Sequence, residues 1–192
     1  MTKIIGLTGG IGSGKTTVAN YLLEHNIPVY IADDEARKIT DSKKVIEKIV
    51  ALFGNEVLEN NKINRASLAK IVFKDKEKLA QLNAIIHPEV KKHFKKWLKN
   101  KIDHKFVVKE SAILFESGSY LDCDAIILVT APLEIRIERT MKRDNSDRET
   151  VMQRINNQMS EEEKVAKSDY IIQNISLENT YVQLNDLLKK LK

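Results

Sequence analysis

Cysteine is almost missing from this chain: among 192 residues only Cys123 carries a thiol. A single cysteine cannot form an intramolecular disulfide, and it argues against a cysteine-based metal cluster. Proteins of the reducing cytoplasm have little use for disulfides, and the cytoplasm is therefore the compartment we expect.

Long apolar runs are also missing. The short run Ile4-Ile5-Gly6-Leu7 cannot cross a membrane, and no segment resembles a signal peptide. We find no internal repeat and no low-complexity tract. The sequence therefore predicts no membrane association.

Neither sign of charge dominates, since 32 lysine and arginine residues stand against 27 acidic ones and give a net charge of +5. A moderately basic chain suits anionic small molecules, but the same balance could equally serve RNA. With 42% hydrophobic residues, a chain of this length can bury one sizeable core and carry a small insertion.

What the chain does contain is a glycine-rich motif near its start. Residues 9–16 match G-x-x-x-x-G-K-[ST], the P-loop that binds nucleotide phosphates. Glycines let several backbone N–H groups approach one anion, and a following helix adds its positive dipole end. We expect Lys15 to reach the β- and γ-phosphates and Thr16 to coordinate Mg²⁺. The residues of this motif predicted to contact ATP are Gly10, Ile11, Gly12, Ser13, Gly14, Lys15, Thr16 and Thr17.

The context of the motif favours this interpretation over a glycine-rich turn without a ligand. Residues 3–8 form a short apolar strand that ends at the loop, and Val18, Leu22 and Leu23 follow at helical spacing. Strand, glycine loop and helix therefore come in the order that a P-loop requires. The chain is predicted to bind a nucleoside triphosphate.

A second strand, residues 29–31, is followed directly by acidic residues. Ligands of doubly wound sheets lie beyond the carboxyl ends of the strands, so Asp33 is well placed to face the phosphates. Acidic residues are common in this chain, however, and position alone leaves a solvated Asp33 equally open.

Residues 41–103 are predicted to form a helical insertion. His87-Pro88 interrupts its apolar periodicity, so we expect Pro88 to lie in the first turn of a new helix. On that helix Phe94 and Trp97 should face inward, and its lysines should face solvent. His87 could equally be an ordinary buried histidine.

Three further strands are predicted at residues 106–108, 125–130 and 170–172, with a helix from Pro132 to about Met141. Strands that alternate with helices imply an α/β fold of the P-loop NTPase type, with a parallel sheet of about five strands. Glu110 follows the third strand, where P-loop enzymes commonly hold Mg²⁺ through an acid.

Residues 143–167 are charged and poor in apolar residues, which is typical of a lid that closes over ATP. Capping boxes are predicted at Ser146 with Glu149 and at Ser160 with Glu163. The nucleotide-binding core then comprises residues 1–40, 104–142 and 168–192. The basic residues of the helix before the lid converge toward its end; they are Arg136, Arg139, Lys142 and Arg143.

Several groups of residues, in order along the chain, resemble one known family, the dephospho-coenzyme A kinases. The opening from Ile5 to Lys15 is similar to the family's start, and nearly the whole chain is covered. The further groups are Ala32-Asp33-x-x-Ala36-Arg37, Ile63-Asn64-Arg65 with Leu68 and Phe73, Leu82-Asn83-x-x-Ile86-His87-Pro88, Leu114-Phe115-Glu116-Ser117, Arg143-Asp144, Arg154-Ile155-x-x-Gln158, and residues 166–174. Two positions depart from the family pattern: Ile31 and Ala112 stand where members usually have Asp and Pro.

The resemblance implies transfer of the γ-phosphoryl group of ATP to the ribose 3′-hydroxyl of dephospho-coenzyme A, with Mg²⁺. Asp33 would be the base that deprotonates that hydroxyl, and the helical insertion, residues 41–103, would bind the acceptor. Arg139, Arg143 and Asn174 would lie on the ATP side, and Arg37, Arg65 and His87 on the acceptor side. Glu110 stands where the family usually has Asp, and it remains the candidate acid beside the metal. We expect a monomer, without excluding a homo-oligomer.

Three rival functions share some of these features. Another small P-loop kinase, acting on a nucleoside or nucleoside monophosphate, would share the loop and the lid but not Asp33 together with His87-Pro88. A GTPase is disfavoured because no N-K-x-D motif occurs. An RNA-binding module would need exposed aromatic residues between its lysines, whereas Phe94 and Trp97 fall on the apolar face.

Overall fold

The computed structural model describes residues 2–72 and 75–191, so that Phe73 of the family resemblance lies outside the described residues. The chain divides into two compact units. The sheet unit comprises Met1–Ile31 and Lys101–Lys192, and the helical unit comprises Ala32–Asn100. The boundary after Ile31 lies nine residues before the position expected from the sequence. The helix that begins at Ala32 therefore belongs to the helical unit.

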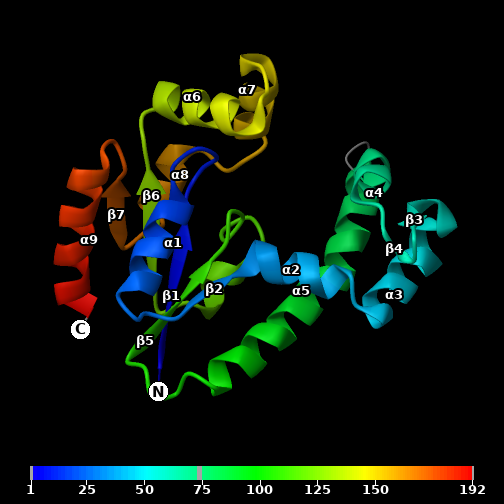
Figure 1. The fold of residues 1–192 in the computed structure, drawn as a ribbon, viewed down its shortest axis with the longest axis horizontal. Helices are drawn as coiled ribbons and strands as arrows, with labels where there is room; N and C mark the ends of the chain where they lie inside the picture. The colour runs from blue at the N-terminus through cyan, green and yellow to red at the C-terminus, as the bar shows by residue number, and fades with distance from the viewer. Residues whose placement is uncertain (1, 73–74, 192) are drawn as a thin grey trace. The chain divides into compact units, whose positions relative to one another are not determined.

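The sheet unit is a five-stranded parallel sheet with helices on both faces and beyond its carboxyl edge (Figure 1), which confirms the predicted fold class. Its elements are β1 (Lys3–Thr8), α1 (Lys15–Glu24), β2 (Val29–Ile31), β5 (Phe106–Glu110), η2 (Ser119–Asp122), β6 (Ala125–Thr130), α6 (Leu133–Asp144), α7 (Arg148–Asn156), α8 (Glu161–Ala166), β7 (Tyr170–Gln173) and α9 (Leu177–Leu191).

The strands follow the order β2-β5-β1-β6-β7, so β1 lies at the centre, paired with β5 and β6. All residues of β5 are buried, including its last residue Glu110, which was expected just beyond the strand. Burial on both faces explains why these strands read as nearly continuous apolar runs.

Helices α1 and α9 cover one face of the sheet (Figure 1). The buried residues of this layer include Val18 and Leu22 from α1 and Leu184 and Leu188 from α9, which pack on Ile5 and its neighbours. Tyr181 of α9 is more than a third exposed and stacks on Tyr21 instead of entering the core, with ring centroids 4.9 Å apart. The core thus places α1, and with it the phosphate loop, firmly against the central strand.

The opposite face carries a smaller apolar cluster and helix α8. Leu114, Phe115 and Ile126 form the cluster, with Cys123 and Met159 packed against it. Lys164 of α8 is almost fully buried, and its ammonium lies 3.5 Å from the Glu116 carboxylate. A buried lysine needs such a partner, so α8 is fastened to the sheet rather than held loosely above it.

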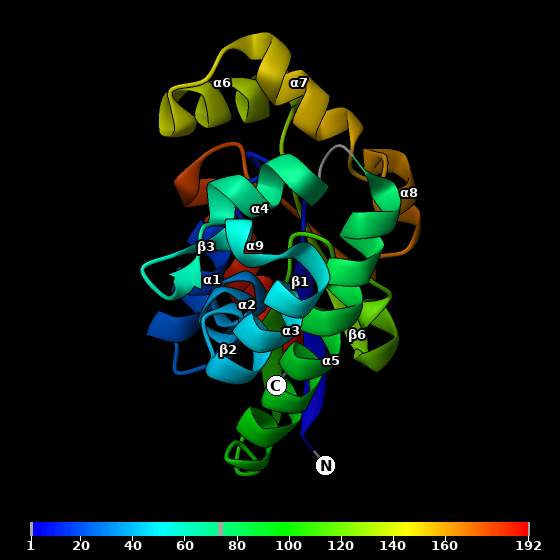
Figure 2. The same cartoon turned by 90° about the vertical axis from the view of Figure 1, so that its right-hand side faces the viewer.

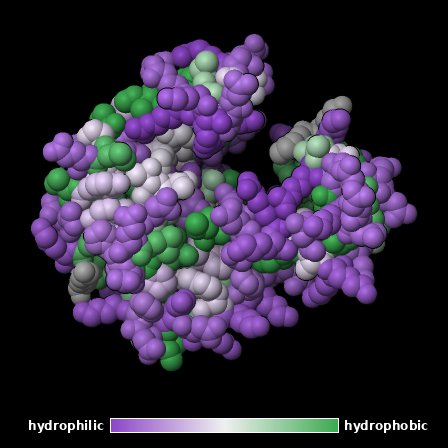
Figure 3. Space-filling view, viewed as in Figure 1, coloured by the Kyte–Doolittle hydropathy of each residue, from purple (hydrophilic) through white to green (hydrophobic). Residues whose placement is uncertain are grey.

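Helices α6 and α7 lie beyond the carboxyl ends of the strands in both views (Figures 1 and 2), and their outer surface is largely hydrophilic (Figure 3). The expected capping box at Ser160 and Glu163 is present. The one expected at Ser146 is wrong: Asp147 is the N-cap and accepts a hydrogen bond from the Thr150 N–H. An aspartate one residue later competes for the same role, because its short carboxylate reaches the first turn equally well.

The helical unit consists of α2 (Ala32–Thr40), α3 (Lys43–Phe53), η1 (Asn55–Val57), β3 (Leu58–Glu59), β4 (Lys62–Ile63), α4 (Arg65–Val72) and α5 (Lys76–Lys99). Its own core contains Val45, Ile49, Phe53, Val57, Ile63, Leu68, Val72 and Leu82. The expected helical insertion thus has a hydrophobic core of its own and includes one small β-hairpin.

That hairpin was not predicted from the sequence, although its turn carries a signal. Asn60 and Asn61 connect β3 to β4, and both have positive φ. Two consecutive left-handed residues are typical of the tight turn between antiparallel strands, and asparagine tolerates this conformation well. Strands of two residues leave too little alternation for periodicity to reveal them.

The predicted helix break at Pro88 is wrong. Helix α5 runs without interruption from Lys76 to Lys99, with Pro88 inside it. Pro88 removes one N–H donor and crowds the carbonyl of Ala84, which ordinarily costs about 3 kcal/mol. Packing of α5 on α2, α3 and α4 keeps the helix continuous despite that cost. Phe94 is buried and Trp97 half-buried, stacked on each other, so the lysine face of α5 offers no exposed aromatic platform for RNA.

Within residues 2–72 and 75–191, no helix combines the length and the apolar character that a membrane span requires.

The environment of Cys123 generates a prediction about its reactivity. Burial raises the pKa of the Cys123 thiol to about 11. At pH 8 only about one such thiol in a thousand is ionised, against roughly one in four at the ordinary pKa of about 8.5. We expect iodoacetamide to alkylate Cys123 roughly a hundredfold more slowly in the folded protein than in urea. Mass spectrometry of timed samples measures both rates, and equal rates would show that the thiol is not protected.

Candidate active site

The glycine-rich loop of the sheet unit connects the end of β1 to the start of α1. Gly12 and Gly14 both adopt positive φ, at 76° and 91°, and Gly14 is the residue before the first turn of α1. The Ser13 N–H closes a tight turn on the Gly10 carbonyl at 3.1 Å. The first N–H groups of α1 then have no carbonyl of their own helix to bond, and they form a ready site for an anion.

Lys15 and Thr16 occupy the first turn of α1. The Lys15 ammonium donates a hydrogen bond to the Gly9 carbonyl at 2.8 Å, so it lies across the loop that it follows. The Thr16 side chain is exposed. Both groups are therefore placed where a phosphate chain held by the loop would meet them.

Helix α6 supports the loop from behind. A side chain at Gly12 would collide with the backbone carbonyl of Arg136, and one at Gly10 would collide with the Arg136 guanidinium. Thr140, one turn further along α6, bonds the same Arg136 carbonyl at 2.7 Å and is fully buried. These two glycines are therefore required for the approach of α6 as well as for the turn itself.

Both backbone polar groups of Ile11 are bonded by side chains from outside the loop. The Ile11 N–H donates to Gln158 Oε1 at 2.9 Å, and the Ile11 carbonyl accepts from Arg136 Nε at 2.9 Å. Arg136 also pairs with Glu161 of α8 at 2.9 Å. Neither Gln158 nor Arg136 was among the predicted ATP residues. The sequence did carry a signal for each: Arg136 is one of the basic residues that converge toward the end of its helix, and Gln158 belongs to the group Arg154-Ile155-x-x-Gln158 of the family resemblance.

Asn174, predicted for ATP, follows β7 and braces the loop. Its Nδ2 donates to the Ser13 carbonyl at 2.8 Å, and its Oδ1 accepts from the Thr180 hydroxyl at 3.0 Å. The residue is almost fully buried, and a side chain at Gly14 would collide with it. Arg139, also predicted for ATP, donates to the carbonyl of Asn174 at 2.9 Å, so the structure brings these two residues together beside the loop.

Arg143, at the end of α6, is bonded within the α6–α7 pair instead. It donates to Asp144 at 2.7 Å, and Arg154 of α7 donates to the same carboxylate at 2.7 Å. A hydrogen bond from Arg143, and to a smaller extent one from Arg154, lowers the pKa of Asp144. Arg143 therefore bonds a neighbour on its own helix, and the ion pair of Arg154 with Asp144 joins α6 to α7.

Glu110, the candidate acid beside a metal, ends β5 between two neighbouring strand ends. It pairs in register with Leu7 of β1 and with Ile31 of β2, and it is buried. Oxygen donors are the ligands that Mg²⁺ prefers, and Mg²⁺ commonly needs only one or two from the protein beside phosphates and water. The hydroxyls of Thr8 and Ser13 are buried without a hydrogen-bond partner in the described part of the chain. Thr16, Glu110 and these hydroxyls form a donor set that fits phosphate with magnesium.

The residues predicted for the acceptor side lie in the helical unit. Asp33 is in the first turn of α2, two residues after the end of β2. Arg65 of α4 donates to Asp41 at 3.0 Å and to the Arg37 carbonyl at 3.4 Å, so the two predicted arginines lie close together. His87 is half-buried in α5, and burial lowers the pKa of its ring below the ordinary value. It is therefore neutral at pH 7.

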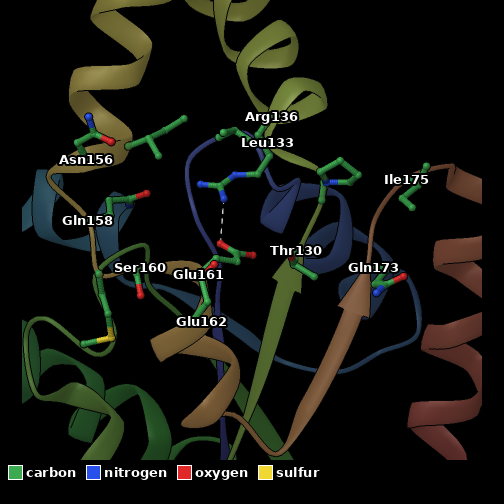
Figure 4. Close-up of a pocket in the computed structure, with 14 residues that line it drawn as sticks. Thr130, Leu133, Arg136, Asn156, Gln158, Ser160, Glu161, Glu162, Gln173 and Ile175 are labelled. Carbon is green, nitrogen blue, oxygen red and sulfur yellow. Dashed lines mark hydrogen bonds and ion pairs between the residues drawn. The ribbon is translucent and has the colours of Figure 1, made fainter.

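A pocket of about 790 Å³ lies between the carboxyl ends of β6 and β7 and the helices α6, α7 and α8 (Figure 4). Arg136 points from α6 across this pocket toward Glu161, and Gln158 faces it from the α7–α8 connection. None of the residues predicted for ATP lines it. The pocket and the phosphate loop nevertheless share a wall, because Arg136 and Gln158 both bond Ile11.

Comparison with known proteins identifies the family of the chain. The family model described as dephospho-CoA kinase matches residues 3–179. A dephospho-CoA kinase of Fusobacterium nucleatum is 44% identical over 190 residues, which cover 98% of this chain and 95% of that protein. The crystal structure of TT1252 from Thermus thermophilus has a TM-score of 0.91 at 35% identity, covering 100% of this chain and 98% of the other. A dephospho-CoA kinase structure from Campylobacter jejuni has a TM-score of 0.74 at 28% identity, with the same coverage.

The structure has a P-loop on a parallel five-stranded sheet, and the similarity to these kinases extends along nearly the whole chain. The chain therefore belongs to the dephospho-CoA kinase family.

Proposed function

We propose that this protein transfers the γ-phosphoryl group of ATP to the ribose 3′-hydroxyl of dephospho-coenzyme A, giving coenzyme A and ADP in the last step of coenzyme A biosynthesis. The observation that carries the proposal is the phosphate loop, with Lys15 and Thr16 in the first turn of α1, in a chain of the dephospho-CoA kinase family.

The donor side uses groups of the sheet unit. Backbone N–H groups of the loop and the positive end of the α1 dipole bind the phosphates, and the Lys15 ammonium can leave the Gly9 carbonyl for the β- and γ-phosphate oxygens. Thr16 and Glu110 would hold Mg²⁺, which neutralises charge on the transferring group. Arg139 and Asn174, which lie together beside Gly14 and Ser13, are the residues we assign to the rest of ATP.

The acceptor side uses groups of the helical unit. Asp33 accepts the proton of the 3′-hydroxyl as its oxygen attacks the γ-phosphorus, and ADP leaves with the electron pair of the broken bond. Arg37 and Arg65 supply positive charge for the anionic acceptor. His87, being neutral, contributes hydrogen bonds and no charge.

The lid that we expect to close over ATP is helix α7. The lid predicted from the sequence extends to residue 167, but α8 is fastened to the sheet through Lys164 and Glu116 and to α6 through Glu161 and Arg136. Helix α7 is joined mainly to α6, by Arg148 with Glu134 and by Arg154 with Asp144. Surface ion pairs are weak, so a motion of α7 relative to fixed α6 and α8 is the motion that the contacts favour.

Composition supports a cytoplasmic enzyme for which a monomer suffices. The single cysteine is partly buried and suits a reducing compartment, and every group assigned to the reaction belongs to one chain. The partners of the reaction are then ATP and dephospho-coenzyme A.

Lys15→Ala should reduce phosphoryl transfer by at least about a hundredfold, because the substitution removes the ammonium that we assign to the transferring phosphates. A coupled assay of ADP release with ATP and dephospho-coenzyme A measures the effect. Lys99→Ala, at the exposed end of α5, is the matched control and should behave as wild type. Turnover of Lys15→Ala within tenfold of wild type would contradict the assignment.

Asp33→Asn should lower kcat by about a hundredfold or more and change ATP affinity little, because it keeps the shape of the side chain and removes its basic oxygen. Asp34→Asn is the control: its carboxylate is half-exposed and lies 3.8 Å from Arg37, a weak surface pair. Loss of activity in Asp34→Asn with an active Asp33→Asn would move the base to the neighbouring residue. If both variants are active, no base is assigned.

Hydrogen exchange should separate α7 from α8. We expect a non-hydrolysable ATP analogue to slow amide exchange in residues 148–156 by about tenfold, while residues 161–166 stay protected with and without it, because only α8 is fastened by a buried lysine. Equal exchange of α7 in both conditions would argue against a closing α7.

A further inference from the structure

The two peptide groups on either side of Ile11 are each flanked by a glycine. The N–H that Gln158 accepts belongs to the Gly10–Ile11 peptide, and the carbonyl that Arg136 bonds belongs to the Ile11–Gly12 peptide. Glycine restricts neighbouring peptide rotation less than any other residue. Without external partners, both peptides would sample several orientations, and a phosphate loop works through the aim of its N–H groups.

The two partners come from different elements and reach the loop from different directions. Arg136 is nearly fully buried and extends from α6, where its pairing with Glu161 leaves little freedom (Figure 4). Gln158 extends from the connection between α7 and α8 toward the same place (Figure 4). The loop is thus held by α6 and by the connection between α7 and α8.

The connection that carries Gln158 is itself fixed. The Gln158 N–H donates to the Ile155 carbonyl at 3.0 Å, at the end of α7. The next residue, Met159, donates its N–H to Glu116 at 3.1 Å, and Glu116 pairs with buried Lys164 of α8. A side chain held on both sides in this way presents its amide oxygen in a defined place, which a mobile surface glutamine would not do.

We propose that Gln158 is a positioning residue of the phosphate loop: by accepting the Ile11 N–H it holds the Gly10–Ile11 peptide in one orientation, so that a nucleotide meets a preformed loop. Gln158 acts through Ile11 and does not touch the reacting atoms. The expected effect on nucleotide affinity is that of one hydrogen bond: its loss weakens nucleotide binding about two- to tenfold. The activity arm of the test rests on the proposed kinase function, but the exchange and binding arms do not.

The test compares three variants. Gln158→Met keeps the length of the side chain and removes the acceptor, and Gln158→Glu keeps an acceptor at the same place. Gln153→Met changes an exposed glutamine on α7 and serves as the control. The readouts are exchange of the Ile11 amide by NMR, ADP affinity by calorimetry, and KM for ATP and for dephospho-coenzyme A.

We expect Gln158→Met to speed Ile11 exchange at least tenfold and to raise both the Kd of ADP and the KM of ATP about three- to tenfold, with the KM of the acceptor within twofold of wild type. Gln158→Glu should retain protection of the Ile11 amide from exchange. Exchange is the only readout used for this variant, because the charge of the introduced carboxylate would repel phosphate and change nucleotide affinity by itself. Gln153→Met should match wild type throughout.

Three results would overturn the proposal: unchanged Ile11 protection in Gln158→Met, ADP binding that is unchanged or tighter, or an equal rise in the KM of both substrates. Tighter ADP binding would mean that Gln158 competes with nucleotide for the Ile11 N–H. If Gln158→Met does not fold, Gln158→Glu decides instead: because this variant keeps an acceptor, loss of Ile11 protection in its folded form would overturn the proposal. Absence of phosphorylation by the wild-type protein would refute the proposed function and leave the exchange and ADP results to decide on Gln158.

Discussion

The close approach of α6 to the phosphate loop is the constraint on which the rest of the sheet unit depends. Gly10 and Gly12 lie directly against Arg136, and neither position has room for a side chain. Because the helix touches the loop backbone, α6 can carry arginines to the carboxyl edge of the sheet and still be buried along its inner side. The glycines of the motif thus serve packing and anion binding at once.

The loop is supported from three directions by residues distant in sequence. Asn174, after β7, bonds the Ser13 carbonyl; Arg136, on α6, bonds the Ile11 carbonyl; and Gln158, between α7 and α8, accepts the Ile11 N–H. Each support uses a side chain on the loop backbone, so the loop keeps its shape although glycine makes it intrinsically soft. Preformed donors lose less entropy on binding than donors that must first be ordered.

Local patterns in the sequence predicted the elements well where one signal dominated. Strand β6 is six residues without a charge, and its bounds agree with the prediction, as do those of β2. Predictions failed where a local preference competed with packing or with a neighbour. Pro88 lies within α5 because three helices pack along it, and Asp147 replaces Ser146 as the cap because both can reach the same N–H groups. The β3–β4 hairpin is too short to show alternation.

The sequence by itself determined the phosphate loop, the parallel sheet and the family, because these depend on residues that are adjacent or regularly spaced along the chain. Lys15 and Thr16 follow Gly14 directly, and no folding information is needed to bring them together. Only the tertiary structure decided what holds Ile11 and Ser13, since Arg136, Gln158 and Asn174 meet the loop across more than a hundred residues of chain. Such contacts carry no spacing rule: they arise where α6, the α7–α8 connection and the end of β7 converge on the carboxyl edge of the sheet, and that convergence is a property of the folded chain alone.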